Sequence, residues 1–157
     1  MTAHVIVLDR TINATVEDVW NVLTDVAQED RVRHGVSHVE LLTEGPYDVG
    51  TRWREQRSLL GHHGEEELEV VESVPPRHTM VMTRLGKDRV STSYSLTPHD
   101  HTTRLSMTLS ADMSDRSPVG KALWSTWGVF DYEHTRKLLR HDLDDIAAAA
   151  EAAHLQS

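Results

Sequence analysis

The chain has 157 residues, long enough for one domain with a substantial hydrophobic core. Its 16 Lys and Arg residues against 25 Asp and Glu residues give a net charge of -9, which argues against binding to nucleic acids or anionic membranes, because both depend on basic surface. The lack of cysteine excludes disulfides, thiolate nucleophiles and cysteine-based zinc sites. We see neither a signal pattern nor an apolar run that could span a membrane, so a single cytoplasmic domain over residues 1–157 is expected.

The first part of the chain predicts a strand followed by two short helices. Residues 4–12 form a β-type run. Thr15 is placed to cap a helix, with Asp18 three residues later as an acidic variant of the capping box. One apolar stripe follows at helical spacing: Val16, Val19, Trp20 and Leu23. Trp20 is therefore expected in the core, and the segment that ends at Gly35 is expected to form a second short helix or a turn.

The middle of the chain changes to a period of two, which is typical of strands. Turn signals separate six expected strands, at residues 36–43, 51–60, 65–74, 78–85, 89–97 and 103–112. Strands at this spacing with tight turns indicate an antiparallel meander. One face of the sheet is predicted to be apolar, and it consists of Trp53, Leu68, Val70, Met80, Met82, Val90, Tyr94, Leu96, Leu105, Met107 and Leu109. The acidic residues Glu65, Glu67 and Glu69 are expected on the outer face.

The end of the chain returns to helix. Ser117–Pro118 is a helix-start signal, with proline at the first helical position. A helix from there to the end would be too long for a domain of this size, so a bend is expected at Gly128. An apolar stripe marks the later part: Leu139, Leu143, Ile146 and Ala150. This helix is the one segment long enough to cover the apolar face of the sheet, which leaves space for a cavity between them.

The order of these elements, together with particular stretches, resembles the START-like superfamily, which includes polyketide cyclases and plant lipid-binding allergens. The stretches are RTINATVEDVWNVLTD (10–25), VELLTEGPYDVGTRWRE (39–55), EVVESVPPRHTMVM (69–82), STSYSLTP (91–98), TRLSMTL (103–109) and LLRHDLDDIAAAAE (138–151). The resemblance implies an α+β helix-grip fold. In that fold a curved antiparallel seven-stranded sheet wraps around a long C-terminal helix, two short helices follow the first strand, and an internal, largely apolar cavity remains.

The resemblance leaves several functions open, because a fold does not determine a reaction. The first is the binding of a small hydrophobic ligand (lipid, aromatic or polyketide-like) in the cavity. The alternative is a polyketide aromatase/cyclase or dehydratase that acts in the same cavity. A third is an interaction or stress-response protein with a closed cavity. No cofactor is expected, and a homodimer remains open.

The adjacent histidines His62 and His63 invite a metal-binding interpretation. A metal site needs three or four converging ligands, whereas neighbouring residues in a strand point in opposite directions. Both residues fall in a predicted turn between Gly61 and Gly64. We therefore interpret the pair as part of a hairpin turn and predict no metal.

The alternation around Trp53 is a stronger candidate for chemistry. If Trp53 faces inward, Glu55 and Arg57 do so too, and buried charges must pair or meet a ligand. They could form an ion pair in the cavity wall, or the opposite register could turn Arg52, Arg54 and Gln56 inward. In a functional site, Arg57 would hold a ligand carbonyl, enolate or carboxylate while Glu55 orients the ligand or moves a proton. Tyr94 could donate a hydrogen bond to a ligand oxygen, which makes Glu55, Arg57 and Tyr94 the catalytic candidates.

Apolar and aromatic side chains complete the predicted site. The candidates for ligand binding are Trp53, Leu68, Met80, Met82, Tyr94, Met107, Trp124 and Trp127. The two late tryptophans lie near the expected bend of the last helix, where aromatic rings could form a ligand-facing wall. Methionines would add adaptable surface to the same cavity. Ordinary core packing is the alternative for each of these residues.

Overall fold

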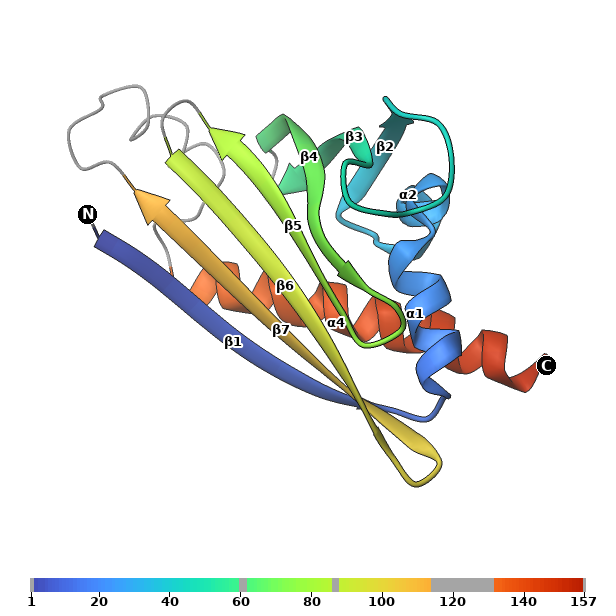
Figure 1. The fold of residues 1–157 in the computed structure, drawn as a ribbon. Helices are drawn as coiled ribbons and strands as arrows, with labels where there is room; N and C mark the ends of the chain where they lie inside the picture. Colours follow the sequence, from blue (N-terminus) through green and yellow to red (C-terminus); the bar gives the residue numbers. More distant parts are fainter. Residues whose placement is uncertain (1, 60–61, 86–87, 114–131, 157) are drawn as a thin grey trace.

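The computed structural model describes residues 2–59, 62–85, 88–113 and 132–156 (Figure 1). The predicted helix start at Ser117–Pro118, the bend at Gly128, and Trp124 and Trp127 lie outside the described residues.

A curved, seven-stranded antiparallel sheet forms most of the described structure (Figure 1). Its strands are β1 (Thr2–Ile12), β2 (Val36–Leu41), β3 (Arg52–Leu59), β4 (His62–Val74), β5 (His78–Leu85), β6 (Asp88–His99) and β7 (Thr102–Met113). The order across the sheet is β1-β7-β6-β5-β4-β3-β2. The predicted meander from β2 to β7 is therefore confirmed, and β1 adds to it beside β7.

The register of β3 shows which face of the strand is turned inward. Trp53 pairs with Leu68 and Glu55 pairs with Glu66 across the ladder to β4. Trp53 and Glu55 are only 2% and 1% exposed, whereas Arg52 and Gln56 are exposed. Glu65, Glu67 and Glu69 of β4 are exposed as well, as expected for its outer face. The observed register is thus the one in which Trp53, Glu55 and Arg57 share the inner face.

The placement of Met80 and Met82 on the inner face was wrong. Residues on the inner face of β5 are Thr79, Val81 and Thr83, all of them buried. Because side chains alternate along a strand, the two methionines point to the outer face. Threonine can occupy the inner positions because its hydroxyl finds a partner: Thr79 donates to the carbonyl of Glu72 at 3.0 Å, and Thr83 donates to that of Glu67 at 2.8 Å.

The histidine pair lies in a strand, where the sequence predicted a turn. His62 and His63 occupy the first positions of β4 and pair with Leu59 and Ser58. The backbone of both residues is therefore part of the ladder between β3 and β4.

Helices pack against one face of the sheet (Figure 1). They are α1 (Val16–Thr24), the 3₁₀ turn η1 (Val26–Gln28), α2 (Glu29–Val32) and α4 (Tyr132–Leu155). Thr15 caps α1 as predicted, because its hydroxyl accepts a hydrogen bond from the backbone N–H of Asp18 at 3.1 Å. No helix among the described residues is both long and apolar enough to cross a membrane.

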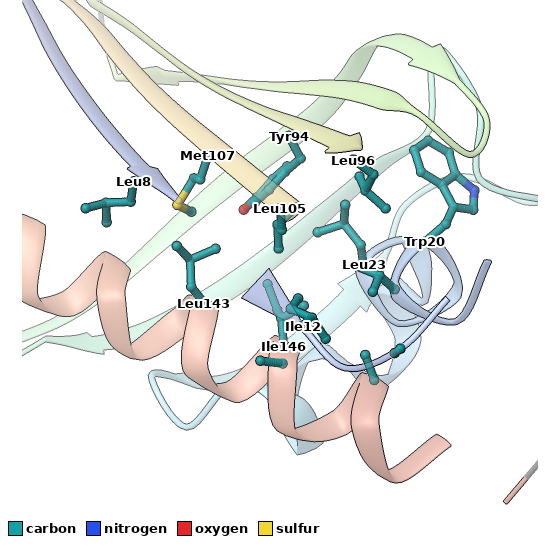
Figure 2. Packing of buried hydrophobic residues seen from close by; sticks show 14 of the residues in the cluster. Leu8, Ile12, Trp20, Leu23, Tyr94, Leu96, Leu105, Met107, Leu143 and Ile146 are labelled. Carbon is teal, nitrogen blue, oxygen red and sulfur yellow. The ribbon is translucent and has the colours of Figure 1, made fainter. Parts of the chain in front are cut away.

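The main hydrophobic core lies between α4 and the sheet. The predicted stripe of α4 is buried in full: Leu139, Leu143, Ile146 and Ala150. Figure 2 shows Leu143 and Ile146 pointing from the helix towards Leu105, Met107 and Tyr94 of the sheet. Trp20 belongs to the same core, as expected. Each fully buried aliphatic side chain contributes about 1.5–3 kcal/mol, so this stripe holds the helix on the sheet.

Candidate functional site

A cavity of about 120 Å³ lies between the inner face of the sheet, α2 and α4. Its apolar lining includes the predicted residues Trp53, Leu68 and Met107. Tyr94, also predicted, lines the cavity and is 5% exposed. Met80 and Met82 are not part of this lining, in agreement with their outward direction. A volume of this size has room for several water molecules or one ring-sized group among the described residues.

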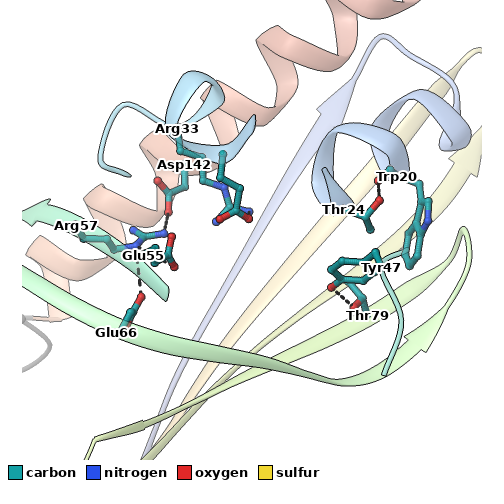
Figure 3. Close-up of polar contacts among 10 residues, drawn as sticks. Trp20, Thr24, Arg33, Tyr47, Glu55, Arg57, Glu66, Thr79 and Asp142 are labelled. Carbon is teal, nitrogen blue, oxygen red and sulfur yellow. Dashed lines mark hydrogen bonds and ion pairs between the residues drawn. The ribbon is translucent and has the colours of Figure 1, made fainter. Parts of the chain in front are cut away.

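Arg57 is the centre of a charged cluster in the lining of the cavity, and Figure 3 shows it beside Asp142, Glu55 and Glu66. Its Nη2 atom donates a hydrogen bond to Oδ2 of Asp142 on α4 at 3.1 Å. Its Nε atom lies 3.8 Å from Oε1 of Glu55 and 3.6 Å from Oε1 of Glu66. Three carboxyl groups, from β3, β4 and α4, therefore share one guanidinium that is largely buried.

A second ion pair comes from the short helix α2. Nη2 of Arg33 lies 3.7 Å from Oε1 of Glu29, and both side chains are less than 10% exposed. The guanidinium of Arg33 also lies over the ring of Tyr94, 5.9 Å from its centroid, in cation–π geometry. Arg33 thus joins the carboxylate of Glu29 to the aromatic wall of the cavity.

Three buried polar atoms of the cavity lining have no hydrogen-bond partner among the described residues. They are Oε2 of Glu29, Oε2 of Glu55 and Nε1 of Trp53. Buried polar groups in folded proteins are almost always hydrogen-bonded, because an unpaired one costs about 1–3 kcal/mol. Residues of the cavity lining that hold such atoms are therefore candidates for contacts with a bound molecule.

Burial changes the protonation of several of these groups. Burial, opposed by Arg33 and assisted by the neighbouring Glu55, raises the pKa of Glu29 from 4.5 to about 8. Burial and then Glu55 likewise raise the pKa of Glu66 to about 8. Near neutral pH both carboxyl groups therefore carry a proton. Burial also raises the pKa of the Tyr94 phenol, which stays protonated and able to donate.

The structure brings the three catalytic candidates Glu55, Arg57 and Tyr94 to one cavity, and it adds residues that the sequence analysis did not identify. The additional members of the cluster are Glu29, Arg33, Glu66 and Asp142. A signal existed for Glu66, since Glu65 and Glu67 were placed outward and alternation turns Glu66 inward. Asp142 lies next to the buried Leu143 on α4, and only the packing of the helix brings it towards Arg57.

Among the described residues, no group of three or more histidines and carboxylates is arranged to hold a metal ion. The carboxyl groups of the cavity instead face guanidinium groups. The polar chemistry of this site therefore rests on ion pairs, protonated carboxyl groups and a phenol.

Solved structures share this architecture. A protein from Thermus thermophilus superposes with a TM-score of 0.75 at 16% identity, over 96% of this chain and 99% of that chain. The Zhui aromatase/cyclase from Streptomyces sp. R1128 gives 0.75 at 16% identity, over 96% and 94%. A START superfamily protein from Mycobacterium smegmatis gives 0.67 at 16% identity, over 98% of each chain. At this level of identity, the likeness shows a common fold.

Among curated proteins, none matches the sequence. The family model described as polyketide cyclase / dehydrase and lipid transport matches residues 3–153 of the chain. That match covers nearly the whole chain, and the shared helix-grip fold agrees with it. The chain therefore belongs to the polyketide cyclase / dehydrase and lipid transport family.

Proposed function

We propose that the protein binds a small, largely hydrophobic ligand in the cavity between the sheet and α4. The observation that carries the proposal is the lining of this cavity, which combines apolar side chains with residues that hold polar atoms without a hydrogen-bond partner among the described residues. Ligand sites commonly have this composition, with apolar surface for affinity and a few polar groups for orientation. Trp53, Leu68 and Met107 would contact the body of the ligand, and Glu55, Arg57 and Tyr94 would contact its polar end.

Catalysis in the same cavity is the second candidate function. The favouring observation is that Glu66 and Glu29 are protonated near neutral pH and lie in the same cavity wall as Glu55 and Tyr94. A protonated carboxyl group can act as a general acid, and a nearby carboxylate can act as a base. An aromatase/cyclase or dehydratase needs such proton transfers at a chain that is held in a reactive shape. The structural likeness to the Streptomyces aromatase/cyclase is consistent with this role.

Native mass spectrometry of the purified protein tests the binding proposal. We expect a bound small molecule that is released on denaturation, or a rise in melting temperature with members of a panel of fatty acids, aromatic polyketide-like compounds and aromatic amines. A protein without any co-purified ligand that no panel member stabilises would contradict the proposal.

The variant Glu55→Gln separates the two candidate functions. It keeps the shape of the side chain but removes its charge. A binding protein should then lose affinity modestly, whereas an enzyme that uses this carboxylate should lose turnover by about 10²–10⁴-fold while it still binds substrate. Glu67→Gln, an exposed change on the outer face of β4, is the matched control.

A further inference from the structure

The cavity holds more carboxyl groups than guanidinium groups. Its described lining includes four acidic residues, namely Glu29, Glu55, Glu66 and Asp142, and two basic ones, Arg33 and Arg57. If all were ionised, the negative charges would exceed the positive charges by two. A buried imbalance of this size is costly, because water does not screen it.

Hydrogen bonds of normal length from the guanidinium groups to the carboxyl groups are few in the same cluster. The contact of Arg57 with Asp142 has hydrogen-bond length, at 3.1 Å. The contacts of Arg57 with Glu55 and Glu66 and that of Arg33 with Glu29 are longer, between 3.6 and 3.8 Å. At those separations the charges attract each other, but the hydrogen bond is weak or absent. Oε2 of Glu29 and Oε2 of Glu55 accordingly remain without a partner among the described residues, although both side chains are more than nine-tenths buried.

We propose that the ligand of this cavity is a cationic amine: a protonated amino group that contacts the carboxyl groups of Glu55 and Glu29, attached to an apolar body that lies between the sheet and α4. This inference rests on the proposed binding function and specifies the chemical class of the ligand. A primary ammonium group supplies one positive charge and three N–H donors and has no acceptor of its own. Its positive charge can take the place of the proton that Glu29 holds near neutral pH, and its N–H groups can donate to the oxygens of Glu29 and Glu55 that have no partner among the described residues.

Other head groups fit less well. A carboxylate, such as that of a fatty acid, would meet four acidic side chains, and the guanidinium groups that could receive it already face Asp142 and Glu29. A neutral hydroxyl supplies one donor and no charge. The aromatic residues Tyr94 and Trp53 in the same lining also favour a cation, since an ammonium group is attracted to the face of such rings.

The protonation of the cluster also favours an amine as the ligand. Glu29 and Glu66 hold protons near neutral pH because burial and the adjacent Glu55 disfavour further negative charge. The charged or titratable groups that act on them are Arg33, which follows α2, Glu55 and Arg57 of β3, Tyr94 of β6 and Asp142 of α4. An entering ammonium group would stabilise the ionised carboxylates, so binding should release protons to the solvent.

The test compares head groups on a constant body. Phenethylamine, phenethyl alcohol and hydrocinnamate share a benzene ring and a two-carbon spacer, and decylamine, decanol and decanoate repeat the comparison on an aliphatic chain. We expect isothermal titration calorimetry near neutral pH to show each amine binding about tenfold or more tightly than the matching alcohol, because charge-assisted hydrogen bonds are about twice as strong as neutral ones. The acids should bind most weakly. Titrations of the amine in buffers of different ionisation enthalpy should show proton release.

Variants test whether the preference for an amine depends on the charged cluster. Glu55→Gln should reduce the preference for the amine over the alcohol about tenfold, because it weakens the charge-assisted hydrogen bond to the amine more than the hydrogen bond to the alcohol. Glu29→Gln removes the other unpaired carboxylate oxygen and serves as a second test if the first variant does not fold. The exposed change Glu67→Gln should leave both affinities as they are.

The outcomes distinguish this inference from the function on which it rests. Equal or tighter binding of an alcohol or an acid would overturn the amine inference and leave the binding function supported. If a neutral compound of the ligand panel stabilises the protein and neither amine binds, the amine inference is likewise overturned and the binding function is supported. If no head group binds, and no compound of the panel stabilises the protein, the binding function fails and the amine inference fails with it.

Discussion

Arg57 on β3 donates a hydrogen bond of 3.1 Å to Asp142 on α4 and thereby joins the sheet to the helix across the cavity (Figure 3). The two residues are 85 positions apart in the sequence. Their side chains are 14% and 5% exposed, so the ion pair is shielded from water. This contact sets the position of Asp142 and Glu55 within the site.

Replacing Arg57 with methionine should strongly destabilise the protein. The change leaves Glu55, Glu66 and Asp142 without the guanidinium that they share, and removal of one partner from a buried ion pair costs about 3–5 kcal/mol. Urea unfolding measures this loss. The matched control is Arg52→Met, which breaks an exposed pair with Glu67 and should cost about 1 kcal/mol or less. Equal losses for the two variants would show that the buried cluster does not depend on Arg57.

The stability of the protein should depend on pH through Glu29 and Glu66. Their pKa values rise from 4.5 to about 8 on folding, so between these values the folded chain binds more protons than the unfolded chain. The free energy of unfolding should therefore decrease as pH rises from about 4.5 to about 8. Above that range these two groups should cause no further change in it. Measurements of urea unfolding at a series of pH values test the slope.

Variants identify the source of that slope. The double variant Glu29→Gln and Glu66→Gln should flatten the profile across this range. Asp9 serves as the contrast, because its hydrogen bonds to Ser106 and Arg104 lower its pKa, and its contribution is lost in more acidic solution. An unchanged profile in the double variant would show that these carboxyl groups do not carry the effect.

Tyr47 should stabilise the loop between β2 and β3 through its hydroxyl group. The hydroxyl lies 2.6 Å from Oγ1 of Thr79, and Thr79 donates its own proton to the carbonyl of Glu72. Tyr47 is therefore the donor of this bond. The variant Tyr47→Phe keeps the ring that packs against Trp20 and Trp53 and should lose about 0.5–1.5 kcal/mol of stability. A loss above about 3 kcal/mol would indicate that the ring itself had moved.

Leu143→Ala tests the attachment of α4 to the sheet. Leu143 is fully buried, so its truncation should leave a cavity and cost about 2–5 kcal/mol in the free energy of unfolding. Leu155, at the end of the same helix, is 84% exposed, and Leu155→Ala should change stability by less than about 0.5 kcal/mol. If the two changes cost the same, α4 would not be held by its apolar stripe.

The sequence allowed the fold to be predicted because its local signals agree with one another. Alternation along β3 was sufficient to place Trp53, Glu55 and Arg57 on one face. The same rule misplaced Met80, because β5 carries apolar residues on both faces and nothing in a single strand shows that the buried hydroxyl of Thr79 finds a partner. A bulge between Val70 and Glu72 also shifts the pairing of β4 with β5, and strand pairing of this kind is not visible in the sequence of one strand.

The candidate site could be predicted in part, because alternation along β3 also indicated some of its polar residues. Glu55 and Arg57 stood out because their strand also carries a tryptophan. Arg33 and Asp142 come from helical segments and reach the cluster through packing between distant parts of the chain, which a one-dimensional pattern does not contain. The unpaired oxygen of Glu55 became evident only when the neighbouring donors of the described residues had been placed.

The ladder between β1 and β7 has a consequence for how the protein is made. Thr2 pairs with Met113, and Asp142 joins the cluster from a helix that is later still in the chain. On a ribosome, β1 must therefore wait for most of the polypeptide before it finds its partner, and contacts between such distant segments slow folding. Until α4 docks, the charges of β3 and β4 remain in contact with water. Their dehydration accompanies the docking of α4, so the cavity between the sheet and α4 forms only after that helix has been synthesised.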